Sequence, residues 1–411
     1  MNASRELLGG RTERLFGELR QGGVWKTLRV LEGPMDARVT VRGYGECLCF
    51  CSNNYLGLAN HPEVVEAGVR GLRDYGAGTA SVRFICGTFG PHERLEASIA
   101  GMMGTEAAYT FVSAWTANEA LFPTACEPGD LIISDELNHA CIIDSIRLAT
   151  TIKKGVLKSV YKNNRLTGEG SLEQRLTEAR RDPGVTGVVW VVTDGVFSME
   201  GSVADLPSMR RLCDAHGAVL VVDDSHGHGV MGQTGRGTHE HFGMYAPAGA
   251  TPTPGVDVFT GTLGKALGGG AGGFIAGDRR TIELMVQRGR PTLFSNALPV
   301  TVACSADKAI EIMLREPERV RRLRDNAAYA RRKIREAGFE VIESPTAICP
   351  IIVHDTAKAI AMSQRLLELG VFVIGFGYPV VPEGHARLRC QVSAAHTPAD
   401  IDFLADALRK L

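Results

Sequence analysis

The sequence predicts an α/β protein built on a mostly parallel sheet, followed by a smaller α+β domain. From about residue 60 to about residue 300, short apolar runs such as AVLVVDD (218–224) alternate with helical segments such as SLEQRLTEARRD (171–182). Strands that helices cover on both faces are apolar along their whole length, so this alternation is typical of a parallel sheet. Beyond residue 300 the pattern changes to a long Arg-rich helical stretch and then to short apolar runs around one further helix.

Individual elements follow from the same patterns. We expect a helix at 3–20 and strand-like segments at 38–51, and the helices near 62, 91 and 171 begin with Pro62, Pro91 and Ser171, which suit the first turn and the N-cap. The Arg-rich stretch 301–338 is expected to be helical with a solvated face, and 246–257 to be a Pro/Ala/Gly surface loop. The predicted division is an N-terminal segment 1–55, a large α/β domain 56–300 and a small α+β domain 301–411.

Composition narrows the class of protein. With 411 residues, 44% hydrophobic and 22% charged, the chain is typical of a globular enzyme. Its formal net charge of −1 argues against nucleic acid or an anionic membrane as partner, and no apolar run is long enough to span a bilayer. The ten cysteines form neither paired zinc ligands nor a disulfide framework, and the N-terminus lacks the apolar core of a secretory signal. We therefore expect a cytoplasmic protein without a metal site.

Polar residues follow several predicted strands at the point where each strand ends. Asp194 ends one strand, Asp223 the next, and Thr262 and Lys265 follow a third, while His139 lies just past another. In open parallel sheets, chemistry collects beyond these carboxyl ends. The predicted strand ends at the aspartates of VVDDSHGHG, so Asp223 and the residues after it lie at the edge of the sheet where the carboxyl ends of the strands meet.

Lys265 lies in GTLGKALGGGAGG, a segment with no other charge. Its ammonium could simply reach solvent, or a desolvated amine could form an imine with a carbonyl compound. Asp223 favours the second interpretation, because an imine-forming lysine and an aspartate that keeps a pyridinium nitrogen protonated are two requirements of a pyridoxal phosphate site.

Eight segments carry a resemblance to a known family. They are NNYLGLANHP, ASVRFICGT, ISDELNHACIIDSIRL, TDGVFSMEG, VDDSHGHGVMGQTGRGTHE, GTLGKALGG, RPTLFSNAL and YPVVPEGHARLRCQVSAAHTP. In this order and spacing, over nearly the whole chain, they resemble the α-oxoamine synthases, pyridoxal phosphate enzymes of the aspartate-aminotransferase fold (fold type I), and most of all their acetyltransferase branch. The resemblance implies a seven-stranded, mostly parallel sheet.

The resemblance implies roles around the cofactor ring. Lys265 would form the imine with the cofactor and later act as acid and base, and Asp223 would pair with the ring nitrogen. His226 would bond the phenolic oxygen with Ser198 nearby, and His139 would stack on the ring. Asp194 and Asp224 are interpreted as turn-capping residues.

Further roles concern the cofactor phosphate and the substrate. The backbone amides of Ala114 and Trp115 and the hydroxyl of Thr262 would hold the phosphate. Ser295 and Asn296 would reach the phosphate of the other subunit, which implies a homodimer with shared sites.

Arg389 would bind the substrate carboxylate, with Asn53 beside it. Arg387 lies on the same strand face, and spacing alone does not exclude it.

The reaction that the resemblance implies joins glycine to the acyl group of an acyl-CoA, acetyl-CoA in this branch. An imine on the cofactor would lose its α-proton to give a quinonoid, whose carbanion attacks the thioester and releases coenzyme A. The product would be a 2-amino-3-keto acid.

Departures from the branch pattern occur at Ala114-Trp115, at Gly227-His228 and at Gly377. We expect Trp115 to reshape the pocket, His228 to add an ionisable ring near the cofactor, and Gly377 to enlarge the space between the domains. These departures leave open a divergent enzyme with another amino acid or electrophile, and an aldol-type reaction. A non-catalytic subunit is disfavoured because Lys265 is present.

Overall fold

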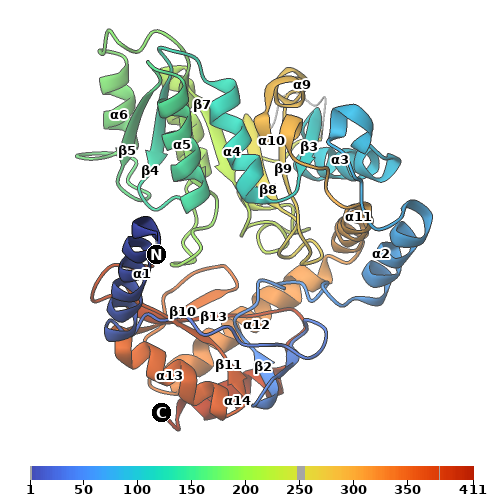
Figure 1. Ribbon diagram of the computed structural model, residues 1–411, viewed down its shortest axis with the longest axis vertical. Coiled ribbons are helices and arrows are strands. Elements are labelled where there is room, and N and C mark those ends of the chain that lie inside the picture. Colours follow the sequence, from blue (N-terminus) through green and yellow to red (C-terminus); the bar gives the residue numbers. More distant parts are fainter. Residues whose placement is uncertain (1, 248–254, 379) are drawn as a thin grey trace.

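The computed structural model describes residues 2–247, 255–378 and 380–411, and its centre is a sheet of seven strands (Figure 1). The strands lie in the order β3-β9-β8-β7-β6-β4-β5. Only β9 runs antiparallel to its neighbours, so the predicted mostly parallel sheet is confirmed. Their bounds are Ala107–Phe111 (β3), Leu131–Asp135 (β4), Leu157–Tyr161 (β5), Val189–Asp194 (β6), Val219–Asp223 (β7), Val258–Thr262 (β8) and Gly273–Gly277 (β9).

Helices cover both faces of this sheet, as the apolar strands require. One face packs against α3, α6, α7 and α11, and the other against α4, α5 and α9. The helices of the large domain are Pro62–Tyr75 (α2), Gly90–Met103 (α3), Ala114–Ala125 (α4), Ala140–Ile152 (α5), Leu172–Ala179 (α6), Leu206–His216 (α7), Thr238–His241 (α8), Arg279–Arg288 (α9), Arg290–Phe294 (α10) and Val300–Arg315 (α11), with a π-turn at Arg83–Gly87. Pro62 and Pro91 lie in first turns and Ser171 caps α6, as predicted.

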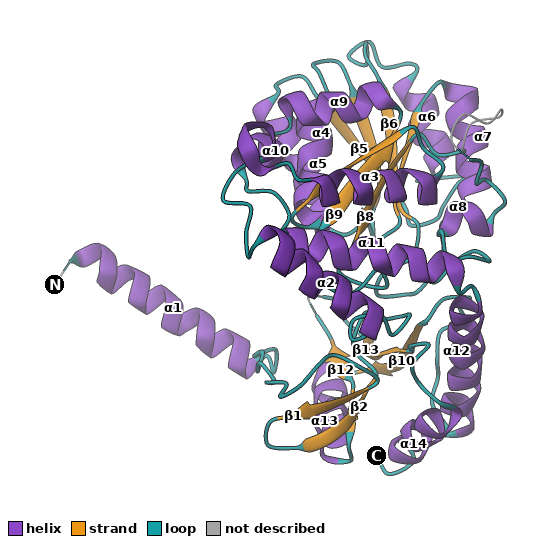
Figure 2. Ribbon diagram, turned by 90° about the vertical axis from the view of Figure 1, so that its right-hand side faces the viewer, coloured by secondary structure: helices purple, strands orange, loops and turns teal. Residues whose placement is uncertain are grey.

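The smaller domain contains two three-stranded sheets, β1-β2-β11 and β10-β13-β12. Its core joins Leu48 and Phe50 from the N-terminal part of the chain to residues between 327 and 408. Its elements are Arg38–Val41 (β1), Gly45–Cys49 (β2), Glu318–Glu336 (α12), Ile348–His354 (β10), Thr356–Glu368 (α13), Val371–Phe372 (β11), Ile374–Phe376 (β12), Ala386–Gln391 (β13) and Pro398–Leu408 (α14). The N-terminal strands therefore belong to this core (Figure 2).

Two helical predictions differ in detail from the structure. The Arg-rich stretch is two helices, because Pro317 disfavours helical backbone at Glu316 and ends α11 there. Arg331 of α12 is buried rather than solvated, and it donates to the carbonyl groups of Thr346 and Ile348 at 2.7 Å. Most of the predicted loop 246–257 lies outside the described residues.

The N-terminal helix α1 (Ala3–Gln21) has no buried residue and projects away from the two domains (Figure 2). Among the described residues, none of the helices has the length and apolar character needed to cross a membrane.

Candidate active site

Three neighbouring strands bring the two predicted aspartates and a threonine that was not predicted to one edge of the large sheet. In the register of the sheet, Asp194 of β6 lies opposite Asp223 of β7, and Asp223 lies opposite Thr260 of β8. Lys265 follows β8 in the next loop. The carboxyl ends of the strands therefore meet where the sequence predicted a site.

Asp223 is buried, with 4% of its surface exposed, and three groups donate hydrogen bonds to it. Oδ2 accepts from Asn118 at 2.6 Å and from Thr260 at 2.8 Å, and Oδ1 accepts from the backbone of Ser225 at 3.0 Å. Burial alone would raise the pKa of Asp223, but these hydrogen bonds and the charge of Lys265 outweigh burial, so its pKa lies below the ordinary value. Asp223 is thus an anion placed to attract a cation.

Lys265 is desolvated in the same region. Burial lowers the pKa of its ammonium group to about 8, although the negative charges of Asp223 and Asp194 oppose that shift. A lysine with this pKa has a substantial neutral fraction near physiological pH, and the neutral amine is the form that attacks a carbonyl carbon.

His226 belongs to a hydrogen-bonded chain that crosses into the small domain. Gln391 donates through Nε2 to Tyr55 Oη at 2.9 Å and to Asn53 Oδ1 at 2.6 Å. The Tyr55 hydroxyl in turn shares a hydrogen bond with Nδ1 of His226, 2.8 Å away. Burial, with the charges of Lys265 and Arg389, holds the pKa of His226 well below its ordinary value, so the ring is neutral and one of its nitrogens donates while the other accepts.

His139 caps α5 and keeps its ring exposed at the site. Its backbone N–H donates to the Asp194 carboxylate at 3.0 Å, so Asp194 bonds a distant segment and not its own turn, which differs from the turn-capping role expected from sequence. The ring meets the Trp115 indole edge to face, with centroids 6.3 Å apart, and 44% of the Trp115 surface is exposed. Two aromatic surfaces are therefore available to a planar ligand.

The start of α4 has the features of an anion site. Ser113 satisfies the N–H groups of Thr116 and Ala117, whereas within the described residues no group accepts from the amide of Trp115, and the amide of Ala114 faces only the Gly272 bridge. Free amides and the helix dipole at such a terminus attract phosphate. A side chain on Gly273 would collide with the backbone of Ala114, so this glycine lets β9 support the terminus closely.

Arg389 and Arg387 share one face of β13 but differ in their partners. Arg387 pairs with Glu200 at 3.2 Å and also donates to the carbonyl oxygen of Met199. Arg389 donates through Nε to the carbonyl oxygen of Ser198 at 2.6 Å, and no carboxylate in the described parts of the chain pairs with it. A buried guanidinium without a counter-ion suits a substrate carboxylate, so the structure favours Arg389 over Arg387.

Among the hydrogen bonds of the described residues, Ser198 takes part through its backbone carbonyl, which accepts from Arg389, and not through its hydroxyl. Ser295 and Asn296 follow α10 and, with Thr116 and Arg83 of their own chain, line a small cavity.

Thr262 Oγ1 donates to Gly272 and accepts from Gly264, in the turn that carries Lys265. The roles predicted for these side chains stay predictions.

Two further expectations from sequence are wrong. His228 packs against Phe274 and lies next to Gly261. A Cβ atom added to Gly261 would lie only 2.6 Å from the imidazole ring. Neighbouring residues of a strand face opposite sides of the sheet, and Thr260, next to Gly261 on β8, bonds Asp223. His228 therefore lies on the face of the sheet opposite to Asp223, near Asp224, and not at the face expected for the cofactor. Gly377 is buried against Thr356 and opens no space between the domains.

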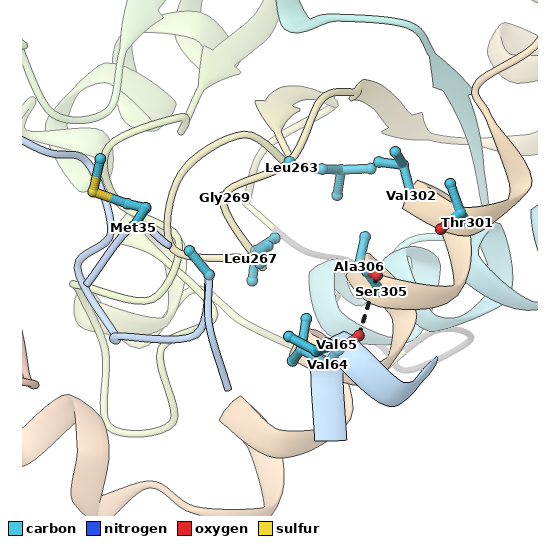
Figure 3. A pocket seen from close by; sticks show the side chains of 13 residues that line it. Met35, Val64, Val65, Leu263, Leu267, Gly269, Thr301, Val302, Ser305 and Ala306 are labelled. Carbon is cyan, nitrogen blue, oxygen red and sulfur yellow. Dashed lines mark hydrogen bonds between the residues drawn. The ribbon is translucent and has the colours of Figure 1, made fainter. Parts of the chain in front are cut away.

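A separate cavity of about 290 Å³ borders the loop of Lys265 (Figure 3). Leu263 and Leu267 from that loop, Val64 from α2 and Val302 from α11 line it, and Ser305 donates to the Val64 carbonyl beside it. Its lining includes none of the predicted site residues and no charged side chain, so it is not where the reacting groups meet.

The residues at the strand ends fit pyridoxal phosphate. An anionic Asp223, a desolvated Lys265, an exposed aromatic His139 and a free amide at the start of α4 match the ring nitrogen, the aldehyde, the ring face and the phosphate of that cofactor. Sequence reasoning missed Asn118, Thr260, Tyr55 and Gln391, which orient the charged residues but are themselves neutral.

Residues 45–408 match the model of the aminotransferase class I and II family, and the chain belongs to that family. Within it the chain is an α-oxoamine synthase, as the sequence motifs predicted. It is 41% identical to 2-amino-3-ketobutyrate coenzyme A ligase of Salmonella typhimurium, over 95% of this chain and 94% of that relative. It is also 41% identical to the mitochondrial ligase of the same name from Homo sapiens, over 96% and 90%.

Another relative is 8-amino-7-oxononanoate synthase of Thermoanaerobacter pseudethanolicus, 40% identical over 96% of this chain and 94% of its own. Among solved structures, Sphingomonas wittichii serine palmitoyltransferase aligns with a TM-score of 0.86 at 28% identity, covering 100% of this chain and 97% of that one. A K265A variant of serine palmitoyltransferase from S. paucimobilis, with a bound aldimine of pyridoxal phosphate and myriocin, aligns with a TM-score of 0.87 at 28% identity, covering 100% and 98%. The predicted fold-type-I architecture is confirmed.

The close approach of Gly273 to α4 yields a testable prediction. Gly273→Ala raises the Kd for pyridoxal phosphate about ten-fold or more, because overpacking costs about 1–3 kcal/mol and here it displaces the phosphate-binding terminus. The control is Gly101→Ala, on an α3 position with open space around it. Equal Kd values in the two variants, by fluorescence titration of apoenzyme, would contradict the assignment.

The depressed pKa of Lys265 predicts how apoenzyme captures the cofactor. Below about pH 8 the neutral amine is the minor form, so the rate of covalent capture rises with pH and levels off above about 8. The unfolded chain binds more protons between about pH 8 and the ordinary pKa of 10.5, so apoenzyme stability also rises through that window. Stopped-flow absorbance measures the first effect, and a capture rate that still climbs up to pH 10 is inconsistent with a desolvated Lys265.

Proposed function

We propose that the chain is a pyridoxal-phosphate-dependent C-acyltransferase that joins glycine, or a related amino acid, to the acyl group of acetyl-CoA or another acyl-CoA. The observation that carries the proposal is the presence, in one site, of Lys265, anionic Asp223 and Arg389 without a counter-ion. When bound, the cofactor withdraws electrons from the α-carbon of the amino acid.

The chain's own residues bind and orient. Arg389 holds the amino-acid carboxylate through a bidentate fork, and Asn53 lies in the same hydrogen-bonded chain. Lys265, once free, takes the proton from the α-carbon, because its pKa of about 8 suits a base near neutral pH. Asp223 would keep the ring nitrogen of the bound cofactor protonated, and His226, oriented by Tyr55 at Nδ1, would bond the phenolic oxygen.

The acyl donor is the least determined part of the proposal. The relatives named coenzyme A ligase and the relative named 8-amino-7-oxononanoate synthase are about equally identical to this chain, at 41% and 40%. We favour acetyl-CoA and retention of the carboxylate, the glycine C-acetyltransferase reaction, because SVRFICGT, LFSNAL and YPVVP follow the acetyltransferase branch. The exposed Trp115 supports the alternative, a divergent amino acid or electrophile.

The proposal includes a homodimer in which Ser295 and Asn296 reach the partner's phosphate. Phe84, Ile85 and Phe294 support it, because these large apolar side chains are 61–73% exposed in a single chain, near α10. The proposal also includes a cytoplasmic location, which fractionation of cells tests.

The test mixes holoenzyme with glycine and a panel of acyl-CoAs and follows free thiol release, with the product identified by mass spectrometry. We expect thiol release with acetyl-CoA, a product that keeps its carboxylate, and a light-scattering mass of twice 44.1 kDa. An amino-acid-dependent spectral change without thiol release from any acyl-CoA would overturn the acyltransferase proposal.

A matched pair of variants tests the substrate site. Arg389→Lys raises the glycine KM about 10- to 100-fold, because lysine keeps the charge but loses the fork, a loss of about 1.4–2.8 kcal/mol. Arg387→Lys, two residues away, leaves the glycine KM within about three-fold, because the charge that pairs with Glu200 is kept and the fork of Arg387 serves Glu200 and Met199 and not the substrate. The reverse ranking of the two variants would assign the carboxylate to Arg387.

A further inference from the structure

Two thiols lie next to the amino-acid site without a role in the proposed reaction. Cys49 ends β2 and is 2% exposed, while Cys51 is partly exposed at the bend that follows. Residues two apart on an extended segment project to the same side, and Sγ of Cys49 lies 3.9 Å from Sγ of Cys51. The two sulfur atoms can reach bonding distance through side-chain rotation and a small backbone shift.

The two thiols differ in character. The hydrogen bond from the Cys51 thiol, aided by the backbone amides of Cys51 and Ser52, lowers the pKa of Cys49 to about 6 against the effect of burial. The same hydrogen bond and burial raise the pKa of Cys51. The pair thus combines a thiolate nucleophile with a neighbouring thiol that can resolve an oxidised sulfur.

Cys47, the third cysteine of the alternating run, lacks these properties. Its thiol faces the carbonyl oxygens of Gly45 and Leu367, and burial raises its pKa. Cys47 is therefore a packed thiol, and the reactive pair is Cys49 with Cys51.

Backbone hydrogen bonds connect this pair to the substrate site. Phe50, between the two cysteines, donates to Phe372 at 2.9 Å and accepts from the backbone of Gln391 at 2.8 Å. Gln391 in turn donates to Asn53, and the Arg389 charge acts on the pKa of Cys51. A bond between the sulfurs would shift residues 50–53 and so displace Asn53 and Gln391 from Arg389.

We propose that Cys49 and Cys51 are a modification site at which a peroxide forms a reversible disulfide that weakens amino-acid binding at Arg389. The Cys49 thiolate attacks the peroxide, one oxygen leaves as water, and Cys49 becomes a sulfenic acid. The Cys51 thiol then attacks that sulfur and releases a second water. Two thiols and one hydrogen peroxide give one disulfide and two water molecules, and a dithiol reverses the change.

The experiment treats holoenzyme with hydrogen peroxide and maps crosslinks by peptide mass spectrometry before and after a dithiol. We expect the Cys49–Cys51 peptide to lose two hydrogen atoms and to regain them on reduction. Crosslinks that are absent, or that involve only Cys47, would overturn the proposal.

The effect on amino-acid binding rests on the proposed function and is read separately. We expect the glycine concentration that half-saturates the change in cofactor absorbance to rise about ten-fold on oxidation. The reason is that a displacement of Asn53 and Gln391 by up to about an ångström misplaces the groups that position the amino acid. Cys51→Ser abolishes this rise, and Cys86→Ser, at an exposed cysteine elsewhere, preserves it. A crosslink with unchanged glycine response would overturn the proposed coupling.

The two failures are distinguishable. If reduced holoenzyme shows no response to glycine at all, the proposed function fails, and the crosslink map still decides whether the disulfide forms.

Discussion

The arrangement depends on one constraint, a carboxylate anion held in the interior at the end of β7. An ionised aspartate is costly to bury unless donors and a cation compensate for lost water. Asn118 from α4, Thr260 from β8 and the backbone of Ser225 supply the donors, and Lys265 supplies the positive charge. These groups meet because β8 lies beside β7 and α4 packs across the same end of the sheet. The order of strands thus determines where a cationic ring nitrogen is stable.

The second half of the site comes from the small domain. Arg389 on β13 reaches across to the carbonyl oxygen of Ser198, and Gln391 on the same strand bonds Tyr55, which bonds His226. The residues proposed to face the cofactor and the residues proposed to bind the carboxylate are therefore connected through neutral side chains that cross the domain boundary. Gln391 of this chain also bonds the backbone of Phe50, between Cys49 and Cys51, which is the contact that the proposed disulfide would use to act on amino-acid binding.

Much of this arrangement follows from sequence, and the exceptions have physical reasons. Lys265 is visible because it is the only charged residue in GTLGKALGGGAGG, and Asp223 because it ends an apolar strand upstream of that lysine. Asn118, Tyr55 and Gln391 give no such signal, because neutral polar residues occur everywhere and only the fold brings them to Asp223 and His226. His228 was misplaced because the chain turns after β7, and spacing does not tell which face of β8 it then covers.

The central claim is that Asp223 keeps the ring nitrogen of the bound cofactor protonated, and nitrogen NMR of holoenzyme carrying ring-¹⁵N pyridoxal phosphate measures this directly. We predict the chemical shift of a protonated nitrogen in the wild-type protein at neutral pH, and the shift of an unprotonated nitrogen in Asp223→Asn. An unprotonated nitrogen in the wild-type holoenzyme would contradict the account, since the charge of Asp223 would then not hold a proton on the ring.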